Sequence, residues 1–214
     1  MVGCAMQNSG EAVSQPGINL LSLDEREMAD LVAGFGWPAY RTAQILRWLY
    51  QRRARSISNM TDLSHLDRAK LSGRATIART PHCLVFRSAD DTRKLVLKLE
   101  DGLEVEAVLI PDESRLTLCL STQVGCTLDC GFCLTGTMGL RRNLKPHEII
   151  EQVLAAQDQL GDGERLSNMV FMGMGEPLAN FNRVLAAVKR IIAPAPHGFG
   201  ISARSVTVST VGLA

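Results

Sequence analysis

The spacing of apolar residues separates a helical first part of the chain from a second part in which strands and helices alternate. Ser22 and Glu25 have the spacing of a capping box, which predicts that a first helix begins at Ser22. Apolar residues then recur at helical spacing, at Met28, Leu31, Val32 and Phe35. Pro38 is placed to open a second helix, and a third is predicted from about Ser64 to Arg74. We therefore expect a small helical domain over residues 20–79.

Between residues 80 and 112 the pattern changes to alternation of apolar and polar positions. The apolar residues fall into three short runs: Leu84 and Phe86, then Leu95, Leu97 and Leu99, then Val105, Ala107 and Leu109. Asp90–Asp91 and Asp101–Gly102 supply turns between the runs. Three short antiparallel strands are expected here, as a small β segment.

After Pro111 the pattern becomes one of strands followed by helices. The predicted order is strand Leu116–Ser121, helix Pro146–Leu160, strand Met169–Met172, helix Asn182–Ile192 and strand Val206–Ser209. Repeated strand–helix–strand units form a parallel sheet, whose ligands bind in the loops after the carboxyl ends of the strands. The expected fold class is therefore α/β, with its chemistry in those loops.

Length and composition indicate an ordinary soluble globular chain. It has 214 residues, of which 46% are hydrophobic and 21% charged, which excludes collagen-like and disordered classes. Residues 1–19 are small and polar without periodicity, and are expected to form a disordered leader. They lack the features of a secretion signal, and no run of eighteen apolar residues occurs. We therefore expect a cytoplasmic protein that does not contact a membrane.

Charge is balanced overall but not along the chain. The formal net charge is +1. Residues 37–79 hold nine basic side chains against Asp62 and Asp67: Arg41, Arg47, Arg52, Arg53, Arg55, Arg68, Lys70, Arg74 and Arg79. With Trp48 and Tyr50 interleaved, this excess is what binding to a phosphate backbone requires. A solvated helix face is the alternative, and charge alone does not separate the two.

The six cysteines are spaced unevenly. Cys4 and Cys83 stand alone, whereas Cys119, Cys126, Cys130 and Cys133 fall within fifteen residues. In a reducing compartment such a group indicates metal or redox chemistry rather than disulfides. The four histidines show no ligand spacing: His65, His82, His147 and His197.

Cys126, Cys130 and Cys133 form a CxxxCxxC loop directly after a predicted strand. Three thiolates at this spacing can hold one iron–sulfur cluster and leave a fourth iron open to a small chelating molecule. Zinc is the alternative, because structural zinc takes four ligands and Cys119 could complete such a set.

The CxxxCxxC loop, with Phe132 before its last cysteine, resembles the signature of the radical S-adenosylmethionine (radical SAM) superfamily. Further motifs occur in order along the chain: Leu118–Cys126, Arg142–Leu144, Met172–Pro177 and Val206–Thr210. Together they look like the dual-specificity adenine carbon-2 methyltransferases of 23S ribosomal RNA and transfer RNA, over roughly residues 20–214. The resemblance implies a partial (β/α) barrel, first half only, over residues 113–214, preceded by the helical domain and the β segment.

The resemblance also implies a role for particular residues. It makes the three loop cysteines the ligands of a [4Fe-4S] cluster and has S-adenosylmethionine bound by Gly175, Glu176 and Ser209. It makes Glu106 the proton acceptor, and Cys119 the cysteine that resolves a covalent protein–RNA intermediate. The implied partners are 23S rRNA, tRNA and a flavodoxin-type electron donor. From the residues alone, Glu106 is an ordinary strand residue and Cys119 a small buried hydrophobe.

In this family a cysteine near the carboxyl terminus carries the methyl group, and the chain contains no cysteine after Cys133. We therefore expect the chain to be a fragment of a longer protein, or a natural truncation, that does not complete methyl transfer. Two alternatives remain open. One is the sister activity on adenine carbon 8, and the other is a non-catalytic RNA-binding module with a structural metal site.

Overall fold

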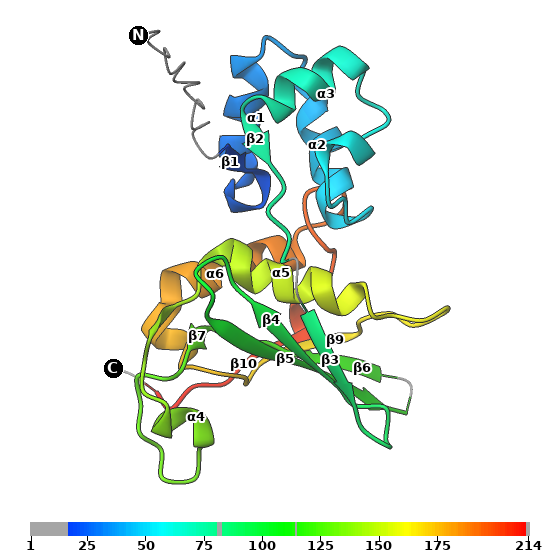
Figure 1. The fold of residues 1–214 in the computed structure, drawn as a ribbon. Coiled ribbons are helices and arrows are strands. Elements are labelled where there is room, and N and C mark those ends of the chain that lie inside the picture. The colour runs from blue at the N-terminus through cyan, green and yellow to red at the C-terminus, as the bar shows by residue number, and fades with distance from the viewer. Residues whose placement is uncertain (1–16, 81–82, 114, 213–214) are drawn as a thin grey trace, which may run out of the picture.

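The computed structural model describes residues 17–80, 83–113 and 115–212. Figure 1 shows a helical domain at the top and a sheet at the bottom, with two helices, α5 (Pro146–Gln157) and α6 (Phe181–Ile192), between them. Cys4, His82 and residues 1–16 of the expected leader lie outside the described residues. Within the described ranges, no helix is both long and apolar enough to span a bilayer.

The helical domain contains the three predicted helices. Its elements are η1 (Leu20–Ser22), α1 (Glu25–Gly34), α2 (Tyr40–Tyr50), η2 (Ile57–Asn59) and α3 (His65–Ser72). Two short parallel strands close it, because β1 (Ile18–Asn19) pairs with β2 (Ala75–Thr76). The end of the expected disordered leader is therefore wrong: residues 18 and 19 are a strand that ties the start of the domain to its end.

The first helix begins two residues later than the capping-box spacing of Ser22 and Glu25 predicts. Asp24 is the actual N-cap: its carboxylate accepts from the Glu27 N–H at 2.8 Å, and the Glu27 carboxylate accepts from the Asp24 N–H at 2.7 Å. Ser22 instead ends η1, where its hydroxyl donates to the Asn19 carbonyl. Two overlapping capping patterns occur in the sequence, and the local turn at residues 20–22 decides between them.

Asp24→Ala is expected to lower the free energy of unfolding by about 1 kcal/mol, because it leaves a helix N–H without its acceptor. Ser22→Ala, at the position that the spacing predicts, should cost clearly less. Urea unfolding of the two variants checks this. Equal losses would contradict the assignment of the cap to Asp24.

A single six-stranded sheet carries all the longer strands. Its order is β10 (Val206–Val208), β9 (Asn168–Phe171), β6 (Arg115–Cys119), β5 (Glu104–Asp112), β4 (Arg93–Lys98) and β3 (Cys83–Arg87). Strands β3 to β6 are antiparallel, and β6, β9 and β10 are parallel, as the alternation of strands and helices predicts. The expected β segment is not separate from the barrel strands, because Val108 of β5 pairs with Cys119 of β6. The pattern change after Pro111 marks a hairpin within one sheet.

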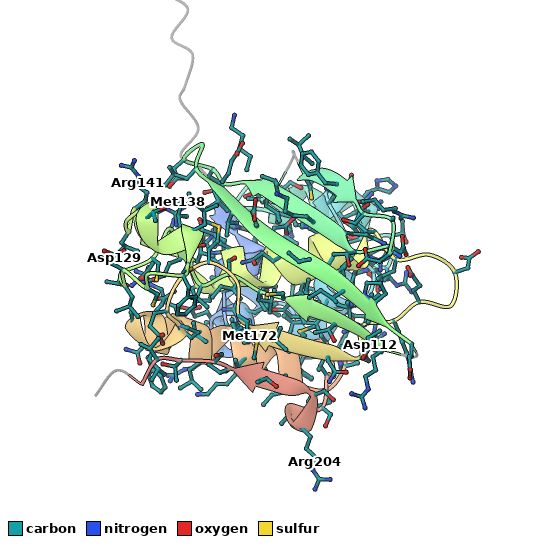
Figure 2. The ribbon with its side chains drawn as sticks, turned by 90° about the horizontal axis from the view of Figure 1, so that it is seen from below. Asp112, Asp129, Met138, Arg141, Met172 and Arg204 are labelled. Carbon is teal, nitrogen blue, oxygen red and sulfur yellow. The ribbon has the colours of Figure 1, made fainter. Side chains whose placement is uncertain are left out.

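The two faces of this sheet differ. Side chains on alternate positions of β5 and β6, such as Ala107 and Leu118, are buried against the helices α5 and α6. The intervening positions, including Glu106 and Cys119, lie on the opposite face and are partly exposed. Figure 2 views the molecule from this side, and no described helix covers the face. We refer to it as the open face.

Helix α5 lies between the sheet and the helical domain (Figure 1) and is therefore buried on most of its circumference. Three of its polar residues, Glu148, Glu151 and Gln152, are buried, with exposed fractions of 7%, 4% and 0%. Arg79, at the end of the helical domain, is 8% exposed, and its Nε lies 2.7 Å from Oε2 of Glu151. A buried ion pair thus joins the helical domain to the sheet layer.

Candidate active site

The cysteine loop lies at the carboxyl ends of the parallel strands. It leaves β6, and its base is closed by pairing of β7 (Gln123–Val124) with β8 (Arg142–Asn143); a short helix, α4 (Leu134–Thr137), forms its far side. Figure 2 shows Asp129, Met138 and Arg141 together at this end, with Asp112 at the opposite end of the sheet. The loop therefore lies beside the end of the open face at which the parallel strands finish, where the sequence predicts the chemistry.

The three cysteines of the loop are free and partly exposed. The Leu128 N–H points at Sγ of Cys126 at 3.4 Å. Backbone N–H groups of Gly136 and Thr135 lower the pKa of the Cys133 thiol. Such N–H donors favour the thiolate, which is the form that ligates iron. The chemistry of the donor set therefore fits an iron–sulfur cluster.

The thiols share one loop but are not gathered into a finished metal site. Within residues 17–80, 83–113 and 115–212, no three His, Cys, Asp or Glu side chains converge in metal-binding geometry. Cys126 lines a cavity of about 540 Å³ together with Leu128, Asp129 and Gly136. Cys119 lies in strand β6 rather than in the loop, and among the described residues it belongs to no group of three or more potential metal ligands.

Gly175 and Glu176 follow β9, on the loop beside the cysteine loop. Glu176 is 4% exposed, and its carboxylate accepts from the Thr210 hydroxyl at 2.6 Å and from the N–H groups of Leu178 and Val211 at 2.9 and 3.1 Å. Burial raises the pKa of Glu176, but these hydrogen bonds outweigh it and leave the pKa lowered. The carboxylate is therefore ionised and fixed in place.

Ser209 and Thr210 follow β10, the neighbouring parallel strand. Ser209 is exposed, and its N–H donates to the Phe171 carbonyl at 3.4 Å, which places it beside the end of β9. Thr210 contacts Glu176 directly and was missed by the sequence interpretation. Its place at the end of the Val206–Thr210 motif, next to Ser209, is the signal in the sequence that points to it.

Glu106 and Cys119 are neighbours on the open face. Val108 pairs with Cys119, so Glu106, two residues earlier, is its diagonal neighbour at about 7–8 Å between backbones. The Lys94 ammonium lies 3.1 Å from Oε1 of Glu106. Burial raises the pKa of the Cys119 thiol, with a smaller opposing effect of the Met172 N–H. The structure thus brings together two residues that lie thirteen positions apart in sequence.

Part of the basic charge of the helical domain is used inside the protein. Several bind protein groups: Arg41 pairs with Asp67, and Arg53, Arg55 and Arg79 all pair with Asp158 of the α5 end. Trp48 is 8% exposed and donates to Asp62, and Tyr50 is 3% exposed, so neither can stack on a base. Four exposed cations make no ion pair among the described residues: Arg47, Arg52, Lys70 and Arg74.

Comparison with known proteins gives two family matches. Residues 18–77 match the ribosomal RNA large subunit methyltransferase N-terminal domain, and residues 120–214 match the radical SAM superfamily. A probable dual-specificity RNA methyltransferase RlmN of Synechocystis sp. is 50% identical over 91% of this chain and 53% of its own length. The RlmN of Alkalilimnicola ehrlichii is 46% identical over 92% of this chain and 54% of its own length.

A solved structure is also similar. The crystal structure of a radical SAM methyltransferase from Sphaerobacter thermophilus matches with a TM-score of 0.82 and 36% identity, over 92% of this chain and 57% of that one. The chain spans about half the length of the curated relatives it matches. Membership of the radical SAM superfamily implies a [4Fe-4S] cluster and S-adenosylmethionine as cofactors. The motifs, the fold and these matches agree, and the chain belongs to the RlmN family of radical SAM methyltransferases.

Proposed function

We propose that this chain acts in the methylation of adenine carbon 2 in 23S rRNA and tRNA. The observation that carries the proposal is the convergence of three loops, after β6, β9 and β10, at one end of the parallel strands. These loops hold the cysteines, the Gly175–Glu176 pair and Ser209. The strand ends of a parallel sheet are where such folds place their ligands.

Different residues of the three loops would hold the cluster and S-adenosylmethionine. Cys126, Cys130 and Cys133 would hold the cluster, which supplies, when bound, the electron that cleaves S-adenosylmethionine. Glu176, with Gly175 and Ser209 beside it, would hold the methionine portion. Oε2 of Glu176 accepts only the Val211 N–H among the described residues, so it keeps a lone pair for the ammonium group of that methionine.

Glu106 and Cys119 would serve the RNA at the open face. The Lys94 ion pair holds the Glu106 carboxylate on that face, where it can accept a proton. Cys119 carries a raised thiol pKa, so it stays protonated at neutral pH until a base removes its proton. The Glu106 carboxylate, as a proton acceptor, and the Cys119 thiol, on the adjacent strand, are suited to the release of a covalently held adenine.

The helical domain, residues 20–79, would bind the RNA through its remaining exposed cations rather than through its aromatic residues. Arg47, Arg52, Lys70 and Arg74 offer the phosphate contacts. We place the reaction in the cytoplasm, with a flavodoxin-type reductant as the electron donor. We expect this chain not to complete methyl transfer; if methylated RNA were found, mass spectrometry of the digest would separate adenine methylated at carbon 2 from adenine methylated at carbon 8.

Anaerobic reconstitution with iron and sulfide tests the central step. The wild-type chain should turn brown, and its visible absorption should bleach on reduction. The triple variant Cys126→Ser, Cys130→Ser, Cys133→Ser should lose at least about nine-tenths of the absorption, because no thiolate remains in the loop. Cys83→Ser, which removes a free cysteine in β3, is the matched control and should keep the colour.

Two results would overturn the proposal. One is a colourless wild-type protein that binds a single zinc ion. The other is a brown protein that fails to cleave S-adenosylmethionine to 5′-deoxyadenosine. Both can be read from metal analysis and from chromatography of the reaction mixture.

A further inference from the structure

Three consecutive polar residues, Ser121, Thr122 and Gln123, are almost completely buried where the chain leaves β6. Their exposed fractions are 0%, 1% and 0%. A polar run at the end of a strand is normally solvated, so each of these side chains requires partners inside the protein. The partners lie on the loop after β9 and on the cysteine loop.

Ser121 and Thr122 attach this segment to the loop after β9. The Met174 N–H donates to the Ser121 hydroxyl at 2.8 Å, and the Thr122 N–H donates to the Met174 carbonyl at 2.8 Å. These contacts continue the pairing of β6 with β9 beyond the ends of both strands. They hold the two backbones together without involving the side chain of Gln123.

The Gln123 side chain connects three separate segments. Its amide nitrogen donates to Oγ1 of Thr127 at 3.0 Å and to Oδ1 of Asn143 at 2.7 Å. Its amide oxygen accepts the Glu176 N–H at 2.9 Å. Thr127 follows the first cluster cysteine, and Glu176 belongs to the cofactor loop, so one buried amide joins both loops.

The fit around Gln123 is close on its other side as well. A Cβ at Gly175 would lie 2.5 Å from the Cβ of Gln123, so only a glycine lets the two loops approach this closely. Glu176 in turn accepts the Thr210 hydroxyl at 2.6 Å. The polar contacts therefore run without a break from Thr127 through Gln123 and Glu176 to the loop after β10.

We propose that Gln123 is a positioning residue, which sets the cysteine loop against the loop that binds S-adenosylmethionine. The proposal rests on the proposed function for its consequence, namely that cluster and cofactor meet at the correct separation. Gln123 is 0% exposed, and its side-chain amide is bonded to Thr127, Asn143 and Glu176. Its effect is transmitted through Thr127 and through the backbone of Glu176.

Hydrogen–deuterium exchange on the metal-free chain tests the coupling directly. In Gln123→Leu the new side chain is similar in size to glutamine, but every hydrogen bond of the side-chain amide is removed. Exchange in residues 125–141 and in residues 173–178 should rise together, by roughly fivefold or more. Gln152→Leu is the matched control, because Gln152 is also 0% exposed but bonds the backbone of Ser121 at 2.9 and 3.0 Å.

The reconstituted protein supplies a second measurement. Gln123→Leu should take up iron as the wild type does, but its dissociation constant for S-adenosylmethionine should rise by about tenfold, and the cofactor-induced change in the electron paramagnetic resonance signal should weaken. Thr127→Val, which removes one hydroxyl in the loop, should raise that constant by roughly threefold. In the double variant the two effects should be less than additive, because both remove the same contact.

Unchanged exchange in residues 173–178, or an equal rise in Gln152→Leu, would overturn the proposal. If Gln123→Leu does not fold, exchange in Thr127→Val decides, and no change in residues 125–141 would then count against the coupling. A wild-type chain that assembles no cluster would refute the proposed function instead. The exchange experiment on the metal-free chain is independent of that outcome.

Discussion

Gly125→Ala is expected to disrupt the base of the cysteine loop and to lower the free energy of unfolding by roughly 3 kcal/mol or more. Gly125 has a φ of +76°, a left-handed backbone conformation that residues other than glycine rarely adopt. A Cβ there would lie 1.8 Å from the carbonyl oxygen of Gly139, on the other arm of the loop. This neighbour is backbone and cannot rotate away, so β7 and β8 would have to separate.

The matched control for this variant is Gly131→Ala, in the same loop. A Cβ at Gly131 would meet no atom within 4 Å. Its free energy of unfolding should stay within about 0.5 kcal/mol of the wild type. Urea unfolding of both variants, with iron uptake as a second measurement, makes the comparison. Similar stability of the two variants would show that the loop does not pack as described.

Arg79→Met is expected to lower the free energy of unfolding by about 3–5 kcal/mol at neutral pH. Methionine fills a similar volume but leaves Glu151, which is 4% exposed, without its ionic partner. Asp158 keeps its ion pairs with Arg53 and Arg55, so the loss of stability comes from the broken pair between Arg79 and Glu151. The double variant Arg79→Met, Glu151→Leu should regain most of the stability, because it leaves no unpaired charge inside.

The loss should depend on pH with a definite sign. Burial raises the pKa of Glu151 above its ordinary value of 4.5, although the charge of Arg79 opposes this. A carboxyl whose pKa is raised by folding favours the folded state below its unfolded pKa, and this contribution is lost as the pH rises through the folded pKa. Removing Arg79 raises the folded pKa further, so the stability deficit of the variant should shrink as the pH is lowered from neutrality and Glu151 becomes protonated. A constant or growing deficit would contradict this origin.

The site residues illustrate what a sequence pattern can and cannot locate. The spacing of Cys126, Cys130 and Cys133 depends on one loop, so it is visible in the sequence. Gln123 and Thr210 lie within the motifs Leu118–Cys126 and Val206–Thr210, but their partner Glu176 is 53 and 34 positions away, so the motifs do not show what the two residues contact. For the basic residues between 37 and 79, the excess of positive charge is visible in the sequence, but the ion pairs that some of them form with Asp158 are not.

The sequence by itself predicted the order of the longer helices and strands, the parallel arrangement of β6, β9 and β10, and the loops in which the candidate site residues lie. These follow from hydrophobic periodicity and from turns, which are local properties of the chain. Tertiary structure alone decided that β5 and β6 share one sheet, that α5 is buried on both sides, and that Arg79 meets Glu151. The physical reason is that burial and ion pairing depend on which residues from distant parts of the sequence pack against a given side chain. A periodic pattern shows only which face of a helix or strand is apolar, not what packs against it.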